Sequence, residues 1–219
     1  TNLQHSQTAT ASLRRALEME PRTIALIQEP WIRHNIEYAA SITSEVGNLN
    51  TPSTDKPRTC VYIPQDVPSA TLTQFCSRDL TAVRIPTNCD APDLVLASAY
   101  MPGDDDNCPP KEMTDLVHHC ERANLELIIC TDSNAHHPLW SSDKPNSRGE
   151  VLCTYLFSTN LNIVNQGSEP TWVTARGQTI IDLTLATENA TGLISGWHVS
   201  DEPSCSDHRR IRFTLLANT

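Results

Sequence analysis

The stretch IICTDSNAHHPLWSS, residues 128–142, places an aspartate, an asparagine and two adjacent histidines directly after an apolar run. The run itself, LELIICT at 125–131, is short and apolar enough to be a strand that is buried on both faces. Polar side chains that follow such a strand lie at the rim of a sheet, where sites form. Asp132 and Asn134 would then belong either to a zinc site or to a site that holds a phosphate and its attacking water.

The spacing of the histidines favours the phosphate. His136 and His137 are adjacent, so on an extended segment they point to opposite sides, unlike the two histidines of a helical H-x-x-x-H pair. The chain also lacks the C-x-x-C spacing of structural zinc sites. Asp132 and Asn134 are two residues apart, so on extended backbone they would share a face and could hold one water between them.

Strands and helices alternate along the rest of the chain. Apolar residues at helical spacing predict helices at 10–20, 110–124 and 150–160. The other apolar runs are short, and they predict strands at 22–30, 58–64, 80–86, 93–102, 125–131, 161–165, 169–174, 179–186, 193–200 and 207–216. The three consecutive runs from 58 to 102 indicate a sheet meander. This mixture favours an α/β fold in which two packed sheets, mixed or antiparallel, are flanked by helices.

Length, charge and cysteine content narrow the class of protein. A chain of 219 residues fits one domain with a sizeable core, and no apolar run approaches the about 18 residues of a membrane span. The net charge of -10 would repel nucleic acid, so a polyanion must meet a local basic patch or a metal ion. The eight cysteines are at least ten residues apart, and several lie inside apolar runs. We interpret them as buried free thiols of an intracellular protein.

Polar residues suited to phosphodiester chemistry recur at the ends of the apolar runs. Hydrolysis of a phosphodiester requires neutralised phosphate oxygens, an activated water and a stabilised leaving group. Mg²⁺ prefers oxygen ligands such as the Glu29 carboxylate, and the imidazole of His208 titrates near neutral pH. The residues at these ends are Glu29, Tyr100, Asp132, Asn134, Asp182, Asp207 and His208.

The segments that carry these residues read, in order, TNLQ, QEP, AYMP, TDSNAHH, PTW, IIDLT and SDH. The set resembles the exonuclease/endonuclease/phosphatase superfamily, and within it the apurinic-type endonuclease domain of non-LTR (LINE-type) retrotransposons. The resemblance covers nearly the whole chain. It implies a four-layered α/β sandwich, a Mg²⁺ ion for which Mn²⁺ can substitute, no small-molecule cofactor, and nicking of a DNA target that primes reverse transcription. It also implies that residues 1–219 are one domain of a longer polyprotein with a tethered reverse transcriptase, acting in the nucleus.

The resemblance assigns three residues to the metal ion. Glu29 would be its main ligand, Asn2 would touch the metal shell or the phosphate, and Asp207 would add charge near the metal. Gln4 stands where the family often has an acidic residue, which leaves the number of metal ions open.

The remaining site residues are assigned to the reaction itself. Asp132 would orient or deprotonate the attacking water, while Asn134 and Tyr100 would bind the phosphate. Asp182 would orient His208, and His208 would stabilise the pentacovalent phosphate.

Arginines near these segments would supply local DNA contacts despite the acidic net charge. The candidates are Arg58, Arg148, Arg176, Arg209 and Arg210. Residues 169–182 predict a hairpin with arms at 171–174 and 179–182 and a four-residue tip. In the family the corresponding hairpin faces DNA, so Arg176 at its tip would suit a minor groove. The family reading also has His136 and His137 border the groove that binds DNA, or pack under it. An ordinary solvated turn is the alternative.

Two other functions remain open at this point. The same fold could serve a phosphomonoesterase or a lipid phosphodiesterase, since fold alone does not fix the substrate. The chain could also be a catalytically inactive domain whose acidic surface binds protein. Every catalytic position of the family pattern is filled, which favours the nuclease.

Overall fold

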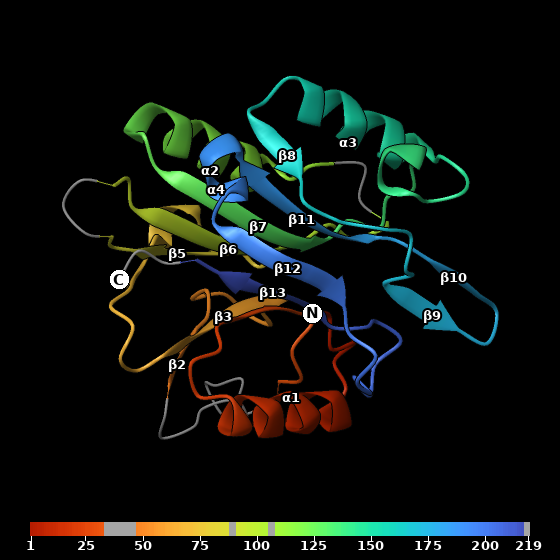
Figure 1. Ribbon diagram of the computed structural model, residues 1–219, viewed down its shortest axis with the longest axis horizontal. Coiled ribbons are helices and arrows are strands. Elements are labelled where there is room, and N and C mark those ends of the chain that lie inside the picture. Colours follow the sequence, from red (N-terminus) through yellow and green to blue (C-terminus); the bar gives the residue numbers. More distant parts are fainter. Residues whose placement is uncertain (33–46, 88–90, 105–107, 217–219) are drawn as a thin grey trace.

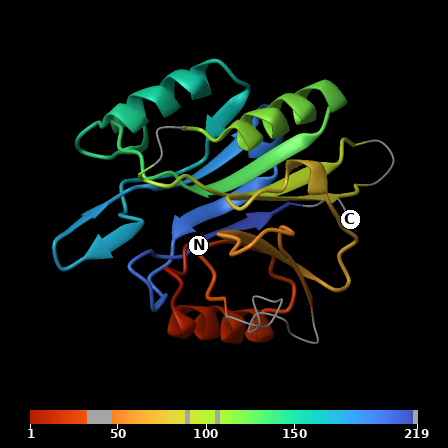
Figure 2. The same ribbon diagram turned by 180° about the vertical axis from the view of Figure 1, so that it is seen from behind.

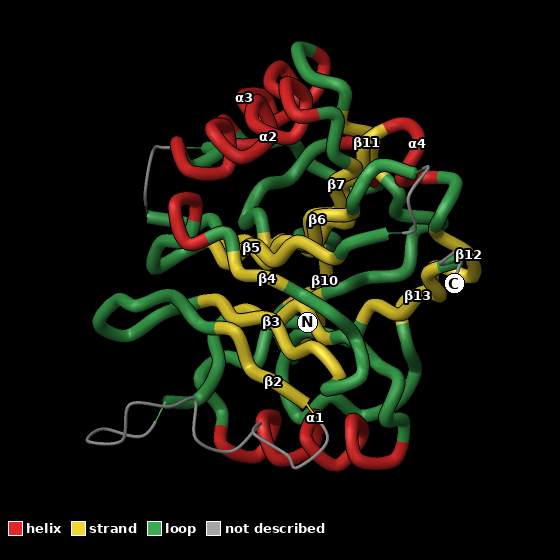
Figure 3. Tube along the Cα trace, turned by 90° about the vertical axis from the view of Figure 1, so that its left-hand side faces the viewer, coloured by secondary structure: helices red, strands yellow, loops and turns green. Residues whose placement is uncertain are grey.

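A computed structural model describes residues 1–32, 47–87, 91–104 and 108–216, which form four layers (Figure 1). Helices α2 (Lys111–Ala123) and α3 (Ser147–Phe157) form one outer layer, and helix α1 (Gln7–Met19) forms the other. Figure 3 shows two layers of strands between them. A short helix and two 3-10 turns lie in connecting segments: α4 (Glu188–Thr191), η1 (Thr73–Phe75) and η2 (Pro138–Trp140). The predicted four-layered α/β sandwich is confirmed.

A six-stranded sheet lies under α2 and α3, as Figure 2 shows from behind. In spatial order its strands are β4 (Ala70–Thr71), β5 (Leu80–Ile85), β6 (Leu94–Tyr100), β7 (Glu126–Asp132), β11 (Asp182–Thr187) and β8 (Leu161–Ile163). Only β6 and β7 run parallel in this sheet, and α2 connects them. The predicted mixed sheet is therefore observed.

The second layer of strands consists of two smaller sheets. One has the order β1 (Ala25–Gln28), β3 (Thr59–Pro64) and β2 (Gly47–Asn50), and the other pairs β12 (Ile194–Val199) with β13 (Ile211–Leu215). A separate hairpin of β9 (Trp172–Thr174) and β10 (Gly177–Thr179) projects from one side of the molecule (Figure 1).

Alternating side chains explain why the strands are stacked in layers. In β1, Ile27 packs toward α1, whereas its neighbour Leu26 packs between the two layers of strands. In β6, Val95 packs toward α2, whereas Leu96 packs between the strand layers. Successive residues of a strand point to opposite faces, so a continuous apolar run needs an apolar partner on each side.

The structure corrects the predicted meander and adds elements that were not predicted, among them β2 and α4. The run at 58–64 does not continue into a meander, because β3 pairs with β1 and β2, whereas β5 and β6 belong to the six-stranded sheet. All residues of β3 are buried, and an apolar run of this kind fits any sheet that covers both of its faces. Strand β2 was missed because its sequence, GNLN, is mostly polar. Helix α4 was missed because a single helical turn gives no periodic pattern.

Helices α1 and α3 begin earlier than their apolar spacing predicted, because polar residues cap them. The Ser6 hydroxyl accepts a hydrogen bond from Ala9 N–H, and α1 therefore starts at Gln7. The Asn146 side chain accepts from Gly149 N–H and starts α3 at Ser147. Periodicity detects the buried face of a helix, whereas the first turn depends on the cap.

The described cysteines are all free, as predicted, and Cys89 lies outside the described residues. They are not all buried as predicted: Cys76 and Cys130 are half-buried, and Cys205 is exposed because it lies in a connecting segment outside the apolar runs. Burial raises the pKa of the Cys60 and Cys120 thiols to about 12. Among the described residues, no helix is both long and apolar enough to cross a membrane.

Candidate active site

Three strand ends in the six-stranded sheet bring the predicted catalytic residues into one row. Tyr100 ends β6, Asp132 ends β7 and Asp182 begins β11. The register pairs Tyr100 with Asp132 and Asp132 with Asp182. Residues 32 and 50 positions apart along the chain thereby become immediate neighbours across the sheet. Both carboxylates are buried, with 2% of Asp132 and 5% of Asp182 exposed.

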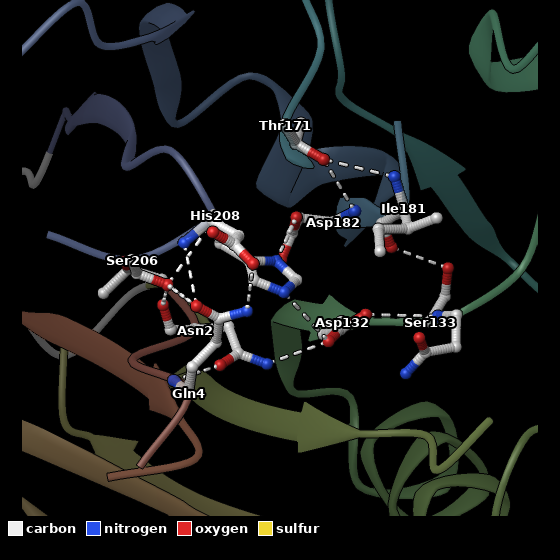
Figure 4. A network of polar contacts seen from close by, with 12 residues as sticks. Asn2, Gln4, Asp132, Ser133, Thr171, Ile181, Asp182, Ser206 and His208 are labelled. Atoms are coloured by element: carbon white, nitrogen blue, oxygen red, sulfur yellow. Dashed lines mark hydrogen bonds and ion pairs between the residues drawn. The ribbon is translucent and has the colours of Figure 1, made fainter. Parts of the chain in front are cut away.

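His208 lies between these two carboxylates (Figure 4). Its Nδ1 is 2.9 and 3.0 Å from the two carboxylate oxygens of Asp182, and its Nε2 is 3.8 Å from Oδ2 of Asp132. The backbone of His208 pairs with that of Trp172 at the base of the hairpin. The Asp182 hydrogen bond orients the imidazole, so that Nε2 faces Asp132.

Burial and charge shift the protonation of this set. Burial, and then the nearby charge of Asp182, raise the pKa of Asp132 to about 7. Burial alone would lower the pKa of His208, but the charge of Asp182 and the hydrogen bond to it raise that pKa to about 9. Near neutral pH the set therefore offers a carboxylate that can accept a proton and an imidazolium that can donate one.

The N-terminal turn completes the surroundings of Asp132. Asn2 pairs with Gln28 of β1, and its side-chain Nδ2 donates to Oδ2 of Asp132 at 2.9 Å. The Asn2 Oδ1 accepts from Gln4 N–H at 2.7 Å. Figure 4 shows this turn facing Asp132 and His208. The predicted metal-shell residue Asn2 thus contacts the predicted base directly.

Glu29 and Tyr100 form the other end of the site. Glu29 directly follows β1, and its carboxylate hydrogen-bonds the Tyr100 hydroxyl. Burial, the charges of Glu29 and Asp132, and this hydrogen bond raise the pKa of Tyr100 above its ordinary value. The charges of Glu29 and Asp132 therefore both disfavour ionisation of the Tyr100 hydroxyl. His5 also approaches Glu29, with its Nε2 3.6 Å from Oε1.

Asn134 departs from the predicted geometry. Its φ is 47°, in the left-handed region, so it does not share an extended face with Asp132. Its backbone N–H instead turns back to Oδ1 of Asp132 at 3.2 Å, and its side-chain Nδ2 donates to Met101 O. An asparagine tolerates this conformation because its short side chain bonds locally. The structure brings Asn134 beside Asp132 through this turn.

Of the five candidate DNA-binding arginines, Arg209 pairs with Glu169, and Arg210 is buried. The other three lie in different settings. Arg58 forms an ion pair with Asp79, and its guanidinium lies 4.8 Å from the centre of the Tyr100 ring. Arg148 donates to the backbone oxygens of Met101 and Ser133, beneath the site. Arg176 is exposed in the hairpin turn. Of these three arginines, Arg176 is the one that is exposed to solvent.

The hairpin tip is shorter than predicted. Thr174 pairs with Gly177, so two residues, Ala175 and Arg176, form the turn. Thr174 Oγ1 accepts from Arg176 N–H at 3.2 Å, which closes the turn. The predicted second arm, 179–182, is divided: β10 ends at Thr179, and Asp182 begins β11. Gly177 was assigned to the tip because glycine favours turns, but here it pairs within the strand.

The two adjacent histidines serve the local structure. His136 Nδ1 contacts the hydroxyls of Ser142 and Thr179, whereas His137 Nδ1 accepts from Leu139 N–H and caps η2. Within the described part of the chain, neither histidine belongs to a cluster of possible metal ligands. The described residues contain one such cluster, formed by Asp132, Asp182 and His208, whose ligand atoms lie within 4.8 Å of one another.

Three residues around this site had no predicted role. Thr171 Oγ1 accepts from the backbone N–H groups of Ile181 and Asp182. Ser206 Oγ accepts from His208 N–H. Gln28 is 1% exposed and donates to Ser98 Oγ and Cys130 O, which ties β1 to the six-stranded sheet. Thr171 and Ser206 stand inside the PTW and SDH segments, so their position in those motifs was the available signal.

Comparisons with known structures define the class of protein. The endonuclease domain of TRAS1, a telomere-specific non-LTR retrotransposon, is 26% identical, with a TM-score of 0.82 over 100% of this chain and 97% of that one. The AP endonuclease LMAP from Leishmania major is 10% identical, with a TM-score of 0.76 over 98% of this chain and 85% of that one. An AP endonuclease from Archaeoglobus fulgidus is 14% identical, with a TM-score of 0.66 over 98% and 97%. The fold is that of the exonuclease/endonuclease/phosphatase superfamily.

Sequence comparison identifies the family. Residues 94–212, more than half of the chain, match the model of the endonuclease-reverse transcriptase family, and the chain belongs to this family. No curated protein matches the chain in sequence. The predicted resemblance to the retrotransposon branch of the superfamily is confirmed, and the protein is an endonuclease of this superfamily.

Proposed function

We propose that the protein nicks one strand of a DNA target in a reaction that depends on a divalent metal ion, and that the nick primes reverse transcription. The proposal rests on one observation. Asp132 and Asp182, at the adjacent ends of β7 and β11, are buried on either side of His208. The nuclease family and the TRAS1 relative support DNA as the substrate.

The site residues suit in-line hydrolysis of a phosphodiester. Asp132, whose pKa is about 7, takes a proton from the attacking water near neutral pH. His208, protonated below a pKa of about 9, donates a hydrogen bond from Nε2 to a phosphate oxygen as negative charge develops there. Asp182 holds the imidazole through Nδ1. The Tyr100 hydroxyl and the Asn2 and Asn134 amides bind the phosphate from the sides.

Carboxylate oxygens that could be ligands of a magnesium ion lie on the Glu29 side of the site. Glu29 offers a half-buried carboxylate, and Oδ1 of Asp207 has no hydrogen-bond partner among the described residues. Mg²⁺ prefers such oxygen ligands and keeps several waters. The Asp132–Asp182–His208 cluster fits less well, because a cation between Asp182 and His208 would break their hydrogen bond. When bound, the metal would neutralise phosphate charge and the leaving oxyanion.

A plasmid assay tests the proposed function. Purified protein with supercoiled plasmid and Mg²⁺ should yield open circles, and EDTA should prevent their formation. Cleavage of an inositol phosphate without nicking of DNA would instead assign the chain to the phosphomonoesterase or lipid phosphodiesterase alternative. If neither substrate is cleaved with Mg²⁺ or Mn²⁺, the inactive interaction domain becomes the better account.

Glu29→Gln should raise the Mg²⁺ concentration needed for half-maximal nicking by about tenfold or more, because it removes the charge of one ligand oxygen. Raising Mg²⁺ or Mn²⁺ should recover part of the rate. Glu18→Gln on the exposed face of α1 is the matched control and should titrate like the wild type. A titration of the Glu29 variant that overlays the wild-type curve would contradict the ligand role.

The hairpin tip should influence where the DNA is nicked. Replacing Ala175-Arg176 with Asn-Gly keeps a two-residue turn but removes the exposed cation. On a mapped DNA fragment, this change should shift or blur the nick positions while the metal dependence is retained. Arg122→Ala, at the exposed end of α2, is the matched loss of an arginine. An unchanged nick pattern at equal rates would show that the turn is an ordinary solvated one.

The domain context belongs to the same proposal. The family name joins an endonuclease to a reverse transcriptase, which supports a tethered reverse transcriptase. Action in the nucleus, where a DNA target is found, is a further part of the proposal. Tethering supplies a high effective concentration, so a domain of net charge -10 needs only weak affinity of its own for DNA.

A further inference from the structure

The segment 206–209 carries two site residues, Asp207 and His208, and it is held from two sides. On one side it pairs with the base of the hairpin through backbone atoms. Val173 N–H donates to Asp207 O at 2.8 Å, and Arg209 N–H donates to Thr171 O at 2.7 Å. On the other side lies the N-terminal turn, residues 2–5. Within the described chain, no backbone–backbone hydrogen bond joins this turn to the segment.

Side chains make the connection to the N-terminal turn instead (Figure 4). The Gln4 amide oxygen accepts from Asp207 N–H at 2.8 Å, and the Gln4 amide nitrogen donates to Oδ2 of Asp207 at 3.0 Å. Ser206 Oγ lies 3.0 Å from Asn2 O and 3.3 Å from the Gln4 amide oxygen, and it accepts from His208 N–H at 3.1 Å. We call Gln4, Ser206 and Asp207 the clasp.

The turn needs such support because its backbone is strained. Gln4 and His5 both have left-handed φ values, 49° and 51°, which cost free energy in residues other than glycine. The conformation directs Gln4 N–H onto Asn2 Oδ1, and this bond leaves the Asn2 amide nitrogen for Asp132. The turn therefore orients the Asn2 amide so that its nitrogen, and not its oxygen, faces the Asp132 carboxylate.

We propose that Gln4 is a positioning residue of the nuclease site. Its amide closes the clasp, and the clasp fixes the His208 segment relative to the Asn2–Asp132 pair. Glutamine suits this position because it supplies an acceptor for the Asp207 N–H and a donor for the Asp207 carboxylate at the same time. A glutamate would keep the acceptor, lose the donor and place a second negative charge beside Asp207.

Gln4→Glu and Gln4→Ala test this proposal, with Gln7→Glu as the matched control at an exposed position three residues away. The activity readout rests on the proposed function. Both Gln4 variants should lower kcat about tenfold and leave KM within about twofold, since displacement of catalytic groups slows the chemical step without removing DNA contacts. The control should retain wild-type kcat and KM.

A second readout does not depend on activity. In the metal-free protein, the imidazole NMR signals of His208, assigned with a His208→Gln variant, should shift in both Gln4 variants and stay in place in Gln7→Glu. Adding Asp207→Asn to Gln4→Glu restores a donor opposite the new carboxylate, so the His208 signals should return toward their wild-type positions.

The outcomes separate the two proposals. If the wild type fails to nick DNA, the proposed nuclease function is wrong. The NMR shift and its reversal still show whether Gln4 positions the His208 segment. Unchanged His208 signals in folded Gln4 variants would overturn the positioning role, whatever happens to kcat. A shift that Asp207→Asn does not reverse would also overturn it, because the hydrogen bonds between Gln4 and Asp207 would then not be its cause.

Discussion

Asp132→Asn is expected to slow DNA nicking by at least about 10²-fold, the scale of losing a group that accepts a proton in the transition state. The amide keeps the size of the side chain but cannot deprotonate water. Single-turnover nicking of plasmid, with circular dichroism to verify the fold, measures the effect. Asp143→Asn, at an exposed loop position, is the matched control. A wild-type rate in the folded Asp132 variant would remove this residue from the reaction.

The wild-type pH profile should agree with this role. Nicking should decline as the pH falls below about 7, because Asp132 becomes protonated and can no longer act as the base. A bound cation would lower the pKa of Asp132, so this limb should lie at or below pH 7. Nicking should also decline as the pH rises through about 9, because His208 loses its proton. A rate that keeps rising above pH 9 would contradict an imidazolium donor.

The same two raised pKa values each give a contribution to stability that is lost as the pH rises. Because the pKa of Asp132 is raised on folding, the folded state holds that proton more tightly, and this contribution is lost as the pH rises from about 4 through about 7. The raised pKa of His208 gives a contribution that is complete below its ordinary value and is lost as the pH rises through about 9. Ionised Asp132 therefore lowers the stability of the folded protein near neutral pH.

His208→Gln should also slow nicking by at least about 10²-fold, since it removes the donor that meets the developing charge on the phosphate. DNA binding in Ca²⁺, measured by fluorescence anisotropy, should change little, because the loss concerns the transition state. His198→Gln on exposed β12 is the control for replacing a histidine. If weaker DNA binding accounts for the whole effect, His208 acts in substrate binding instead of in the transition state.

Asp182→Asn gives a related test of how His208 is held. The variant removes the charge that raises the pKa of His208, so the alkaline decline in rate should move from about 9 toward lower pH. The maximal rate should fall as well, because an amide at position 182 no longer fixes the imidazole with two carboxylate oxygens. An unshifted alkaline limb would mean that Asp182 does not set the protonation of His208.

Sequence patterns predicted where the helices and strands lie better than they predicted which strands pair. The apolar run at 125–131 became β7 and the periodic run at 110–124 became α2, since burial on one or two faces leaves its period in the sequence. The same patterns predicted a meander that β3 does not join. Pairing depends on which buried faces fit together, and many apolar runs fit equally well.

The site shows a similar division between residue type and geometry. The motifs predicted Asp132, Asp182 and His208, and the structure brings all three together. They did not predict that Arg58 pairs with Asp79 beside Tyr100, or that the hairpin tip contains two residues. They gave no role to Gln4, whose three side-chain hydrogen bonds connect positions more than 200 residues apart.

The sequence by itself determined the superfamily, the layered α/β class and the chemical groups available, because these follow from residue types in a fixed order along the chain. Only the tertiary structure decided how those groups meet. The register of β6, β7 and β11 aligns Tyr100, Asp132 and Asp182 in one row, and the left-handed turns at Gln4 and Asn134 direct their amides. Register and turn conformation arise from long-range packing and hydrogen bonding, which no local stretch of sequence contains.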